Sequence, residues 1–185
     1  MVQDVMKETR SAMQKGIDSM KTALQKVRTG RASISLLDGI SVEYYGSHTP
    51  LNQLANLSAP EPRLLTVQPW DRAALSAIEK AILKSELGLT PSNDGVIIRI
   101  PVPPLNEERR RELVKMVKKS AEEYKVEIRN HRRDAIAMLK DFEKEKQISQ
   151  DDFKRGQDEV QILTDEFIKR IDDLVAAKEK EIMEV

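Results

Sequence analysis

A row of basic residues at helical spacing is the strongest chemical signal in this sequence. Steps of four and three residues connect seven positions, six of them basic: Arg111, Lys115, Lys118, Glu122, Lys125, Arg129 and Arg132. Residues at this spacing share one face of an α-helix. A rigid row of cations complements the phosphates of a structured RNA, which proteins recognise largely by backbone and shape.

Arginine is concentrated at the ends of this row. Arg133 follows Arg132, Arg110 lies at the start of the same segment, and Arg28 and Arg31 lie close together in an earlier one. A guanidinium group can donate two parallel hydrogen bonds to a phosphate, which an ammonium group cannot do in the same geometry. These arginines are therefore candidate RNA contacts. The competing interpretation is a solvated helix face with i,i+4 pairs to neighbouring glutamates.

The sequence carries no motif of a catalytic or metal site. Its two histidines, His48 and His131, have no partner histidine at helical spacing, and there is no phosphate loop, dinucleotide-binding motif or nucleophile elbow. The absence of cysteine excludes thiolate metal sites and thiol catalysis, and fits a reducing cytosol. We expect no catalytic residue, no metal and no cofactor, and a structural role for His131.

Composition favours a protein of long helices. Of the 185 residues, 34% are charged and 4% are aromatic, which suits exposed helices better than a β-sandwich or a base-stacking surface. The zero formal net charge hides an asymmetry: residues 1–31 and 105–133 each carry +4, residues 32–104 carry −2 and residues 134–185 carry −6. No segment resembles a signal peptide or a membrane span, so a cytoplasmic protein without membrane contact is expected.

The distribution of proline divides the chain. All eight prolines lie between Pro50 and Pro104, and all seven methionines lie outside that stretch. Because proline is excluded from helix interiors, the flanks are predicted to be continuous helix and the middle is not. We therefore predict a discontinuous helical domain of residues 1–30 and 105–185, and an inserted domain of residues 31–104.

Each flank carries apolar residues at alternating steps of three and four. The three predicted stripes are Met6, Met13, Ile17, Met20, Leu24 and Val27; Leu113, Val117, Ser120, Tyr124, Ile128, His131, Ala135, Met138 and Phe142; and Phe153, Val160, Thr164, Phe167, Ile171 and Leu174. The first helix should end near Gly30. The second should begin after Pro104, and Ser149 with Asp152 is typical of the N-cap of the third. Three amphipathic helices predict an elongated three-helix bundle.

The middle of the chain predicts a small α/β domain. Residues 40–44, 63–67 and 96–100 have the composition of strands, and residues 73–87 suit a helix that Gly88 ends. The fold class is therefore α+β, with a β/α/β insert in a helical bundle. Two short links make a hinge possible. Its residues would be Thr29, Gly30, Arg31, Pro103, Pro104, Leu105 and Asn106.

Six strings of residues, in order along the chain, carry a resemblance to a known family. They are Val27-Arg28-Thr29-Gly30-Arg31-Ala32-Ser33, Tyr44-Tyr45-Gly46, Thr49-Pro50-Leu51-Asn52-Gln53-Leu54-Ala55, Leu87-Gly88-Leu89-Thr90-Pro91, Pro103-Pro104-Leu105-Asn106-Glu107-Glu108-Arg109-Arg110 and Arg129-Asn130-His131-Arg132-Arg133-Asp134. Together they resemble the bacterial ribosome recycling factor family, and the likeness extends over the whole chain.

The resemblance implies an L-shaped protein of tRNA-like dimensions whose two domains are joined by a flexible double linker. It implies binding to the post-termination ribosome, and splitting of that ribosome into subunits with elongation factor G and GTP, so that mRNA and tRNA are released. The partner would hydrolyse the GTP. By the same resemblance, large-subunit ribosomal RNA near the subunit interface would be contacted by Arg28, Arg31, Arg110, Arg129, Arg132 and Arg133, and the insert would contact elongation factor G.

The alternative hypothesis is a helical scaffold or adaptor that pairs its apolar stripes with partner helices. The stripes are interrupted by Ser120, His131 and Thr164. Such interruptions favour a bundle that buries its stripes within one chain, and hence a monomer, over a long intermolecular zipper.

Overall fold

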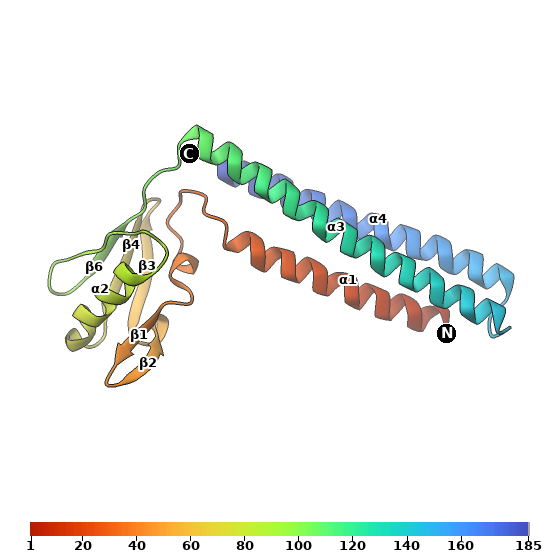
Figure 1. The fold of residues 1–185 in the computed structure, drawn as a ribbon, viewed down its shortest axis with the longest axis horizontal. Helices are drawn as coiled ribbons and strands as arrows, with labels where there is room; N and C mark the ends of the chain where they lie inside the picture. The colour runs from red at the N-terminus through yellow and green to blue at the C-terminus, as the bar shows by residue number, and fades with distance from the viewer. Residues whose placement is uncertain (185) are drawn as a thin grey trace. The chain divides into compact units, whose positions relative to one another are not determined.

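The chain folds into two compact units. The computed structural model describes residues 1–184 (Figure 1). One unit contains residues 1–27 and 110–184, and the other contains residues 28–109. The first unit is thus discontinuous in sequence, and the second is inserted into it.

Three long helices form the first unit. They are α1 (Val2–Gln25), α3 (Glu107–Lys144) and α4 (Gln150–Met183). Within this bundle, α1 and α4 run in the same direction and α3 runs in the opposite one (Figure 1). The predicted three-helix bundle and the α+β class are confirmed. Among residues 1–184, none of the helices combines the length and the apolar character that crossing a membrane requires.

The buried face of α1 contains most of its predicted stripe, but Val5 is buried in place of Met6, and the predicted end of the helix is wrong. Met13, Ile17 and Met20 are at most 1% exposed. The helix ends at Gln25, five residues before Gly30. Gly30 does adopt a left-handed conformation, with φ of 78°, although it does so beyond the helix. A Cβ atom there would lie 3.3 Å from the backbone nitrogen of Leu105, so glycine permits a close approach of two chain segments.

The buried face of α3 is shifted by one residue from part of its predicted stripe. Ala121 and Leu139 are buried, where Ser120 and Met138 were predicted, and Met138 is 41% exposed. Because α3 packs between two other helices, its buried face is wider than a single row of positions. Leu139 belongs to a cluster in which Val5 of α1 and Val160 of α4 are also buried.

The turn between α3 and α4 contains the predicted cap. The Ser149 hydroxyl oxygen accepts a hydrogen bond from the backbone N–H of Asp152 at 3.0 Å, and the Asp152 carboxylate accepts one from the backbone N–H of Ser149 at 3.3 Å. Hydrogen bonding to Ser149 lowers the pKa of Asp152. This capping box satisfies N–H groups that the first turn of a helix leaves without partners, and it fixes where α4 begins.

The inserted unit contains more strands than predicted. Its strands are β1 (Ser41–Tyr44), β2 (Ser47–Pro50), β3 (Ala55–Glu61), β4 (Leu64–Pro69), β5 (Ser92–Asn93) and β6 (Ile98–Pro101). Strands β1 and β2 form an antiparallel hairpin, and the others form an antiparallel sheet in the order β3-β4-β6-β5. The predicted strands correspond to β1, β4 and β6. The missed ones are largely exposed edge strands, which show little apolar alternation.

One helix, α2 (Leu75–Lys84), packs with the strands in a shared core. It is shorter than predicted, because residues 72–74 form a 3₁₀ turn before it and the chain becomes extended at Ser85. Ile78 and Ile82, one turn apart, are fully buried. The sheet contributes alternate residues, of which the fully buried ones are Leu65, Val67, Ile98 and Ile100.

The two chain segments that enter and leave the insert are both attached to the turn between β3 and β4. The backbone N–H of Ala32 donates to the carbonyl of Pro62 at 2.7 Å, and that of Val102 donates to the carbonyl of Arg63 at 2.8 Å. The predicted hinge residues lie just outside these attachments. Asn106 accepts a hydrogen bond from the backbone N–H of Arg109 at 2.7 Å, at the start of α3. Hinge motion there stays a prediction.

The insert also contains a hydrogen bond between two titratable side chains. The Tyr44 hydroxyl donates to the Asp71 carboxylate at 2.7 Å, which raises the pKa of Tyr44 to about 12 and lowers that of Asp71. The stabilisation from the lowered Asp71 pKa is present above the ordinary aspartate pKa. It is lost as the pH falls through the pKa that Asp71 has in the folded protein. The stabilisation from the raised Tyr44 pKa is present below the ordinary tyrosine pKa and is lost as the pH rises through about 12.

Replacing Tyr44 by phenylalanine is expected to raise the pKa of Asp71 toward its ordinary value. Part of the shift should remain, because the backbone N–H of Ala73 still donates to Asp71 at 2.9 Å. An NMR titration of the Asp71 carboxyl carbon measures this. The matched control is Tyr45→Phe, since the exposed neighbouring tyrosine makes no hydrogen bond to Asp71. An unchanged Asp71 pKa in Tyr44→Phe would contradict the assignment.

Candidate RNA-binding interface

Four of the six candidate arginines lie on helix α3. This helix is unbroken from Glu107 to Lys144, so its arginines are held on one rigid element. Arg129, Arg132 and Arg133 fall within little more than one turn. Arg110 precedes Arg132 by 22 residues, a distance of about 33 Å along the axis. The structure thus groups three of the candidates, and it places Arg110 near the other end of the same helix.

Two lysines of the basic row form ion pairs with α4. Lys118 lies 3.7 Å from Glu179, and Lys125 lies 2.6 Å from Asp172. The Lys125 side chain is only 15% exposed, and its hydrogen bond to Asp172 raises its pKa. These lysines therefore neutralise carboxylates at the surface where α3 and α4 meet. The predicted row is not uniformly available to a phosphate backbone, because Lys118, Lys125 and Arg132 contact α4.

Two of the arginines are oriented by neutral acceptors on α4. Arg132 Nη1 donates to the Gln161 side-chain oxygen at 3.4 Å, and Arg110 Nη1 donates to the backbone carbonyl of Met183 at 3.4 Å. The Nε atom of Arg110 is buried without a hydrogen-bond partner. Neither acceptor is a carboxylate, so each contact positions the guanidinium group and leaves its positive charge uncompensated.

Arg129 and Arg133 have no such contacts. Within residues 1–184, neither side chain makes a hydrogen bond or an ion pair. Arg133 is exposed and Arg129 is half-buried. They are four residues apart, which places them on one face, with Arg132 beside them. Each guanidinium group carries five N–H donors, so this cluster can bind several phosphate oxygens at once.

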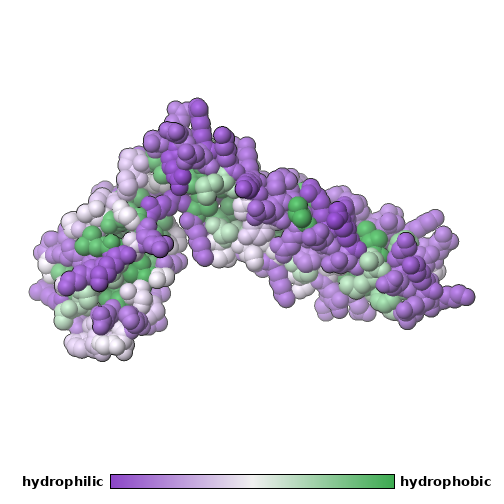
Figure 2. All heavy atoms as spheres, viewed as in Figure 1, coloured by the Kyte–Doolittle hydropathy of each residue, from purple (hydrophilic) through white to green (hydrophobic). Residues whose placement is uncertain are grey.

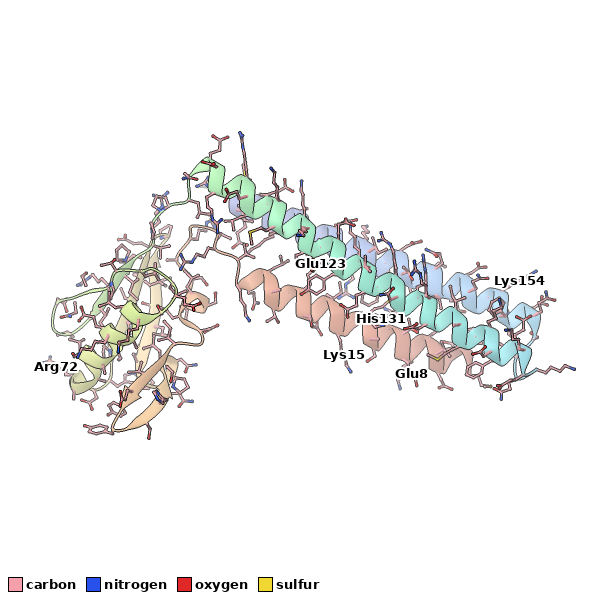
Figure 3. All side chains as sticks on the ribbon, viewed as in Figure 1. Glu8, Lys15, Arg72, Glu123, His131 and Lys154 are labelled. Carbon is pink, nitrogen blue, oxygen red and sulfur yellow. The ribbon has the colours of Figure 1, made fainter. Side chains whose placement is uncertain are left out.

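His131 lies within the same segment of α3 (Figure 3). Its Nε2 atom is buried without a hydrogen-bond partner and lies 3.6 Å from the Glu127 carboxylate. Within residues 1–184, no three His, Cys, Asp or Glu side chains are grouped as metal ligands would be. The surroundings of the arginine cluster therefore suit electrostatic binding and offer no constellation for metal chemistry.

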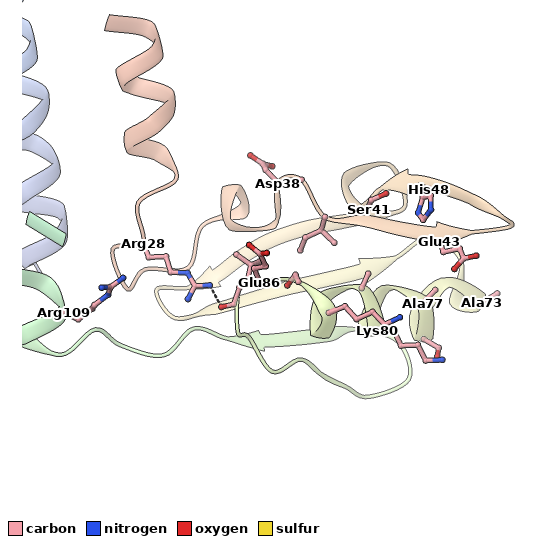
Figure 4. A pocket seen from close by; sticks show the side chains of 17 residues that line it. Arg28, Asp38, Ser41, Glu43, His48, Ala73, Ala77, Lys80, Glu86 and Arg109 are labelled. Atoms are coloured by element: carbon pink, nitrogen blue, oxygen red, sulfur yellow. Dashed lines mark hydrogen bonds between the residues drawn. The ribbon is translucent and has the colours of Figure 1, made fainter. Parts of the chain in front are cut away.

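Arg28 and Arg31 belong to the inserted unit. Arg31 is exposed, and Arg28 donates a hydrogen bond to the carbonyl of Leu87 (Figure 4). Arg28 also lines an open cavity of about 1160 Å³. The charged residues along this cavity have both signs: Arg28, Lys80, Lys84 and Arg109 against Asp38, Glu43 and Glu86. Because the charges are mixed, the cavity shows no preference for an anion.

Sequence reasoning missed the contribution of α4. Its acidic residues recur every seven positions, at Asp158, Asp165, Asp172 and Glu179. This repeat could have indicated ion pairs with the basic row of α3, since such spacing marks one flank of a packed helix. Gln161 carried no signal of its own. Its role is visible only once the two helices are placed side by side.

Comparisons with known proteins agree on one family. The model of the family described as ribosome recycling factor matches residues 20–183. A ribosome-recycling factor from Carboxydothermus hydrogenoformans is 59% identical over 185 residues, covering both chains completely. The protein of the same name from Syntrophobacter fumaroxidans is 55% identical over 185 residues, again covering both completely.

Two solved structures are similar over the whole chain. A solution structure of the ribosome recycling factor has a TM-score of 0.78 and 46% identity, covering 100% of this chain and 98% of that one. The second is described as models for the T. thermophilus ribosome recycling factor and the E. coli elongation factor G bound to the E. coli post-termination complex. It has a TM-score of 0.66 and 50% identity, with full coverage of both chains.

Proposed function

Because the chain belongs to the ribosome recycling factor family, we propose that it binds the post-termination ribosome and promotes its dissociation into subunits, with elongation factor G and GTP. In this reaction mRNA and tRNA are released. The chain acts as a monomeric cytoplasmic binding protein and not as an enzyme, and its partner factor hydrolyses the GTP. The second structural relative, in which a ribosome recycling factor and elongation factor G are bound to a post-termination complex, supports this assignment.

The observation that carries the proposal is the arginine cluster of Arg129, Arg132 and Arg133. Three guanidinium groups lie within little more than one turn of a rigid helix, and among residues 1–184 none of them is paired with a carboxylate. Such groups bind phosphates through charge-assisted, often bidentate hydrogen bonds. We propose that the cluster binds large-subunit ribosomal RNA near the subunit interface, and that Arg110, Arg28 and Arg31 add contacts outside it.

The insert has a separate role in this proposal. Anchoring of the bundle through α3 would leave the inserted unit to meet elongation factor G. The hinge would consist of Thr29, Gly30 and Arg31 on one segment, and of Pro103, Pro104, Leu105 and Asn106 on the other. Motion at these two links would let a GTP-driven partner move one unit while the other stays bound.

The scaffold alternative is weakened by where the apolar stripes lie. Residues of all three stripes are buried within the chain, among them Met13, Val117 and Phe167. Figure 2 shows mostly polar side chains over the visible face of the bundle, with only small apolar areas. A zipper with partner helices would need a continuous exposed stripe.

Replacing Arg132 by alanine is expected to lower the affinity for ribosomes about tenfold, since a charge-assisted hydrogen bond to phosphate is lost. Cosedimentation with ribosomes across a range of salt concentrations measures this. The plot of log affinity against log salt should also become shallower by about one unit, because one phosphate contact disappears. Splitting with elongation factor G and GTP should slow in parallel.

The matched control is Arg155→Ala. Arg155 is also exposed and pairs only locally with Asp152 on α4, far in sequence from the cluster. This variant should bind ribosomes with unchanged affinity. An Arg132→Ala protein that is folded by circular dichroism, yet binds with unchanged affinity and salt dependence, would show that the cluster is not the RNA contact.

A further inference from the structure

The ion pairs between α3 and α4 follow a regular register that changes at Arg132. Lys118 pairs with Glu179, and seven residues further along α3 Lys125 pairs with Asp172, which lies seven residues earlier on α4. The next step of this register places Arg132 opposite Asp165. A third ion pair is therefore expected there, since antiparallel helices with a seven-residue repeat bring such positions together.

The structure shows a different arrangement at this step. Arg132 donates to the Gln161 side-chain oxygen at 3.4 Å, and the Gln161 side-chain nitrogen donates to the Asp165 carboxylate at 2.9 Å. Gln161 thus lies between the arginine and the carboxylate that the register assigns to it. Asp165 also fixes the amide orientation, because only the Gln161 nitrogen can donate to a carboxylate, which leaves the oxygen for Arg132.

We propose that Gln161 is a positioning residue. It binds the Asp165 carboxylate, prevents that carboxylate from pairing with Arg132, and so keeps Arg132 available to RNA. This inference rests on the proposed function. A neutral amide holds the guanidinium group through one N–H and does not compensate its charge. A carboxylate would bind it more strongly, and could occupy two donors in the geometry that a phosphate needs. The amide therefore orients the arginine at low cost to its affinity for phosphate.

The contrast with the other two pairs supports a functional reason. Lys118 and Lys125 are paired with carboxylates, and neither belongs to the cluster of Arg129, Arg132 and Arg133. Arg132 belongs to that cluster, and it is the position at which the carboxylate is displaced by Gln161. Of the three positions in this register, the two outside the cluster are thus paired with carboxylates, and the one that belongs to the cluster is held by an amide.

The test is Gln161→Leu, which keeps a similar size but can neither accept from Arg132 nor donate to Asp165. Arg132 should then pair with Asp165, and ribosome affinity should fall about tenfold with a salt slope shallower by about one unit, as in Arg132→Ala. The midpoint of urea unfolding should not fall, because Gln161 is exposed and an ion pair replaces its hydrogen bonds.

Two further variants separate positioning from a direct contact. Adding Asp165→Asn to Gln161→Leu removes the competing carboxylate and should restore affinity to within about threefold of the unmodified protein. In an Arg132→Ala background, Gln161→Leu should cause no additional loss, since a residue that acts through Arg132 has nothing left to position.

Each outcome distinguishes this inference from the proposed function. If Arg132→Ala weakens ribosome binding while Gln161→Leu does not, the positioning role is wrong and the proposed function stands. The same holds if Gln161→Leu weakens binding equally with and without Arg132, or if Asp165→Asn fails to rescue it. Unchanged binding by Arg132→Ala would instead contradict the proposed RNA contact.

Discussion

Reversing both unpaired charges of the arginine cluster, in the double variant Arg129→Glu and Arg133→Glu, is expected to reduce ribosome affinity about 100-fold or more. Each replacement removes charge-assisted hydrogen bonds to phosphate and adds repulsion against the RNA backbone. Within residues 1–184 neither arginine has a hydrogen-bonding or ionic partner, so no such contact inside the protein is lost. The effect should therefore appear in ribosome binding and not in folding.

Ribosome cosedimentation at two salt concentrations measures this prediction, with circular dichroism to establish that the helices are intact. The matched control is Lys154→Glu with Lys169→Glu, which changes the net charge equally but on α4. Because both control lysines are exposed and lie outside the cluster, that variant should keep most of its affinity. Equal losses in the two double variants would show that overall charge, and not the cluster, governs binding.

The second large effect concerns the packing of the bundle. Replacing Gly156 by valine is expected to lower the free energy of unfolding by about 2 kcal/mol or more, through overpacking. A Cβ atom at Gly156 would lie 2.9 Å from Leu139 Cδ1 of α3 and 3.3 Å from Val2 Cγ1 of α1. Leu139 is fully buried and has little space into which to move. Gly156 thus marks a point where all three helices approach one another closely.

Gly16 provides the matched control, because it is a buried helical glycine with more room. A Cβ atom there would lie 3.6 Å from the nearest atom, in the Glu127 side chain, which is an ordinary contact. Gly16→Ala should therefore raise the free energy of unfolding by about 0.5–1 kcal/mol, as expected when glycine in a helix interior is replaced. Urea unfolding measures both variants. A Gly156→Val protein as stable as the unmodified one would contradict the packing argument.

The parts of the fold that could be predicted from the sequence are those set by local pattern. The stripe of Met13, Ile17 and Met20 and the capping box at Ser149 depend on residues close together in the chain. The confinement of proline to residues 50–104 likewise indicated a segment without long helices, because proline acts on the backbone next to it. The edge strand β3 was missed because its residues are mostly exposed, so that backbone pairing and not apolar alternation places it in the sheet.

The positions of the charged residues of the candidate site could be predicted from the sequence, but their partners within the protein could not. The spacing of the basic row on α3 was visible from the sequence, whereas the pairing of Lys118 and Lys125 with carboxylates, and of Arg132 with Gln161, depends on the register with α4. The same holds for Gly156 and Gln161. Both matter because of atoms contributed by a second or third helix, and a single sequence does not state which helix faces will meet.

The attachment of both linker segments to one turn has a consequence for how the protein can be rearranged. Ala32 and Val102 bond to the adjacent residues Pro62 and Arg63, so the insert begins and ends at nearly the same point. A domain whose ends coincide is a self-contained cassette. Such a domain can be replaced by a homologous domain or by a short peptide linker without changing the path of the chain in the flanking helices. The same two junctions therefore serve for domain exchange in evolution and in protein engineering.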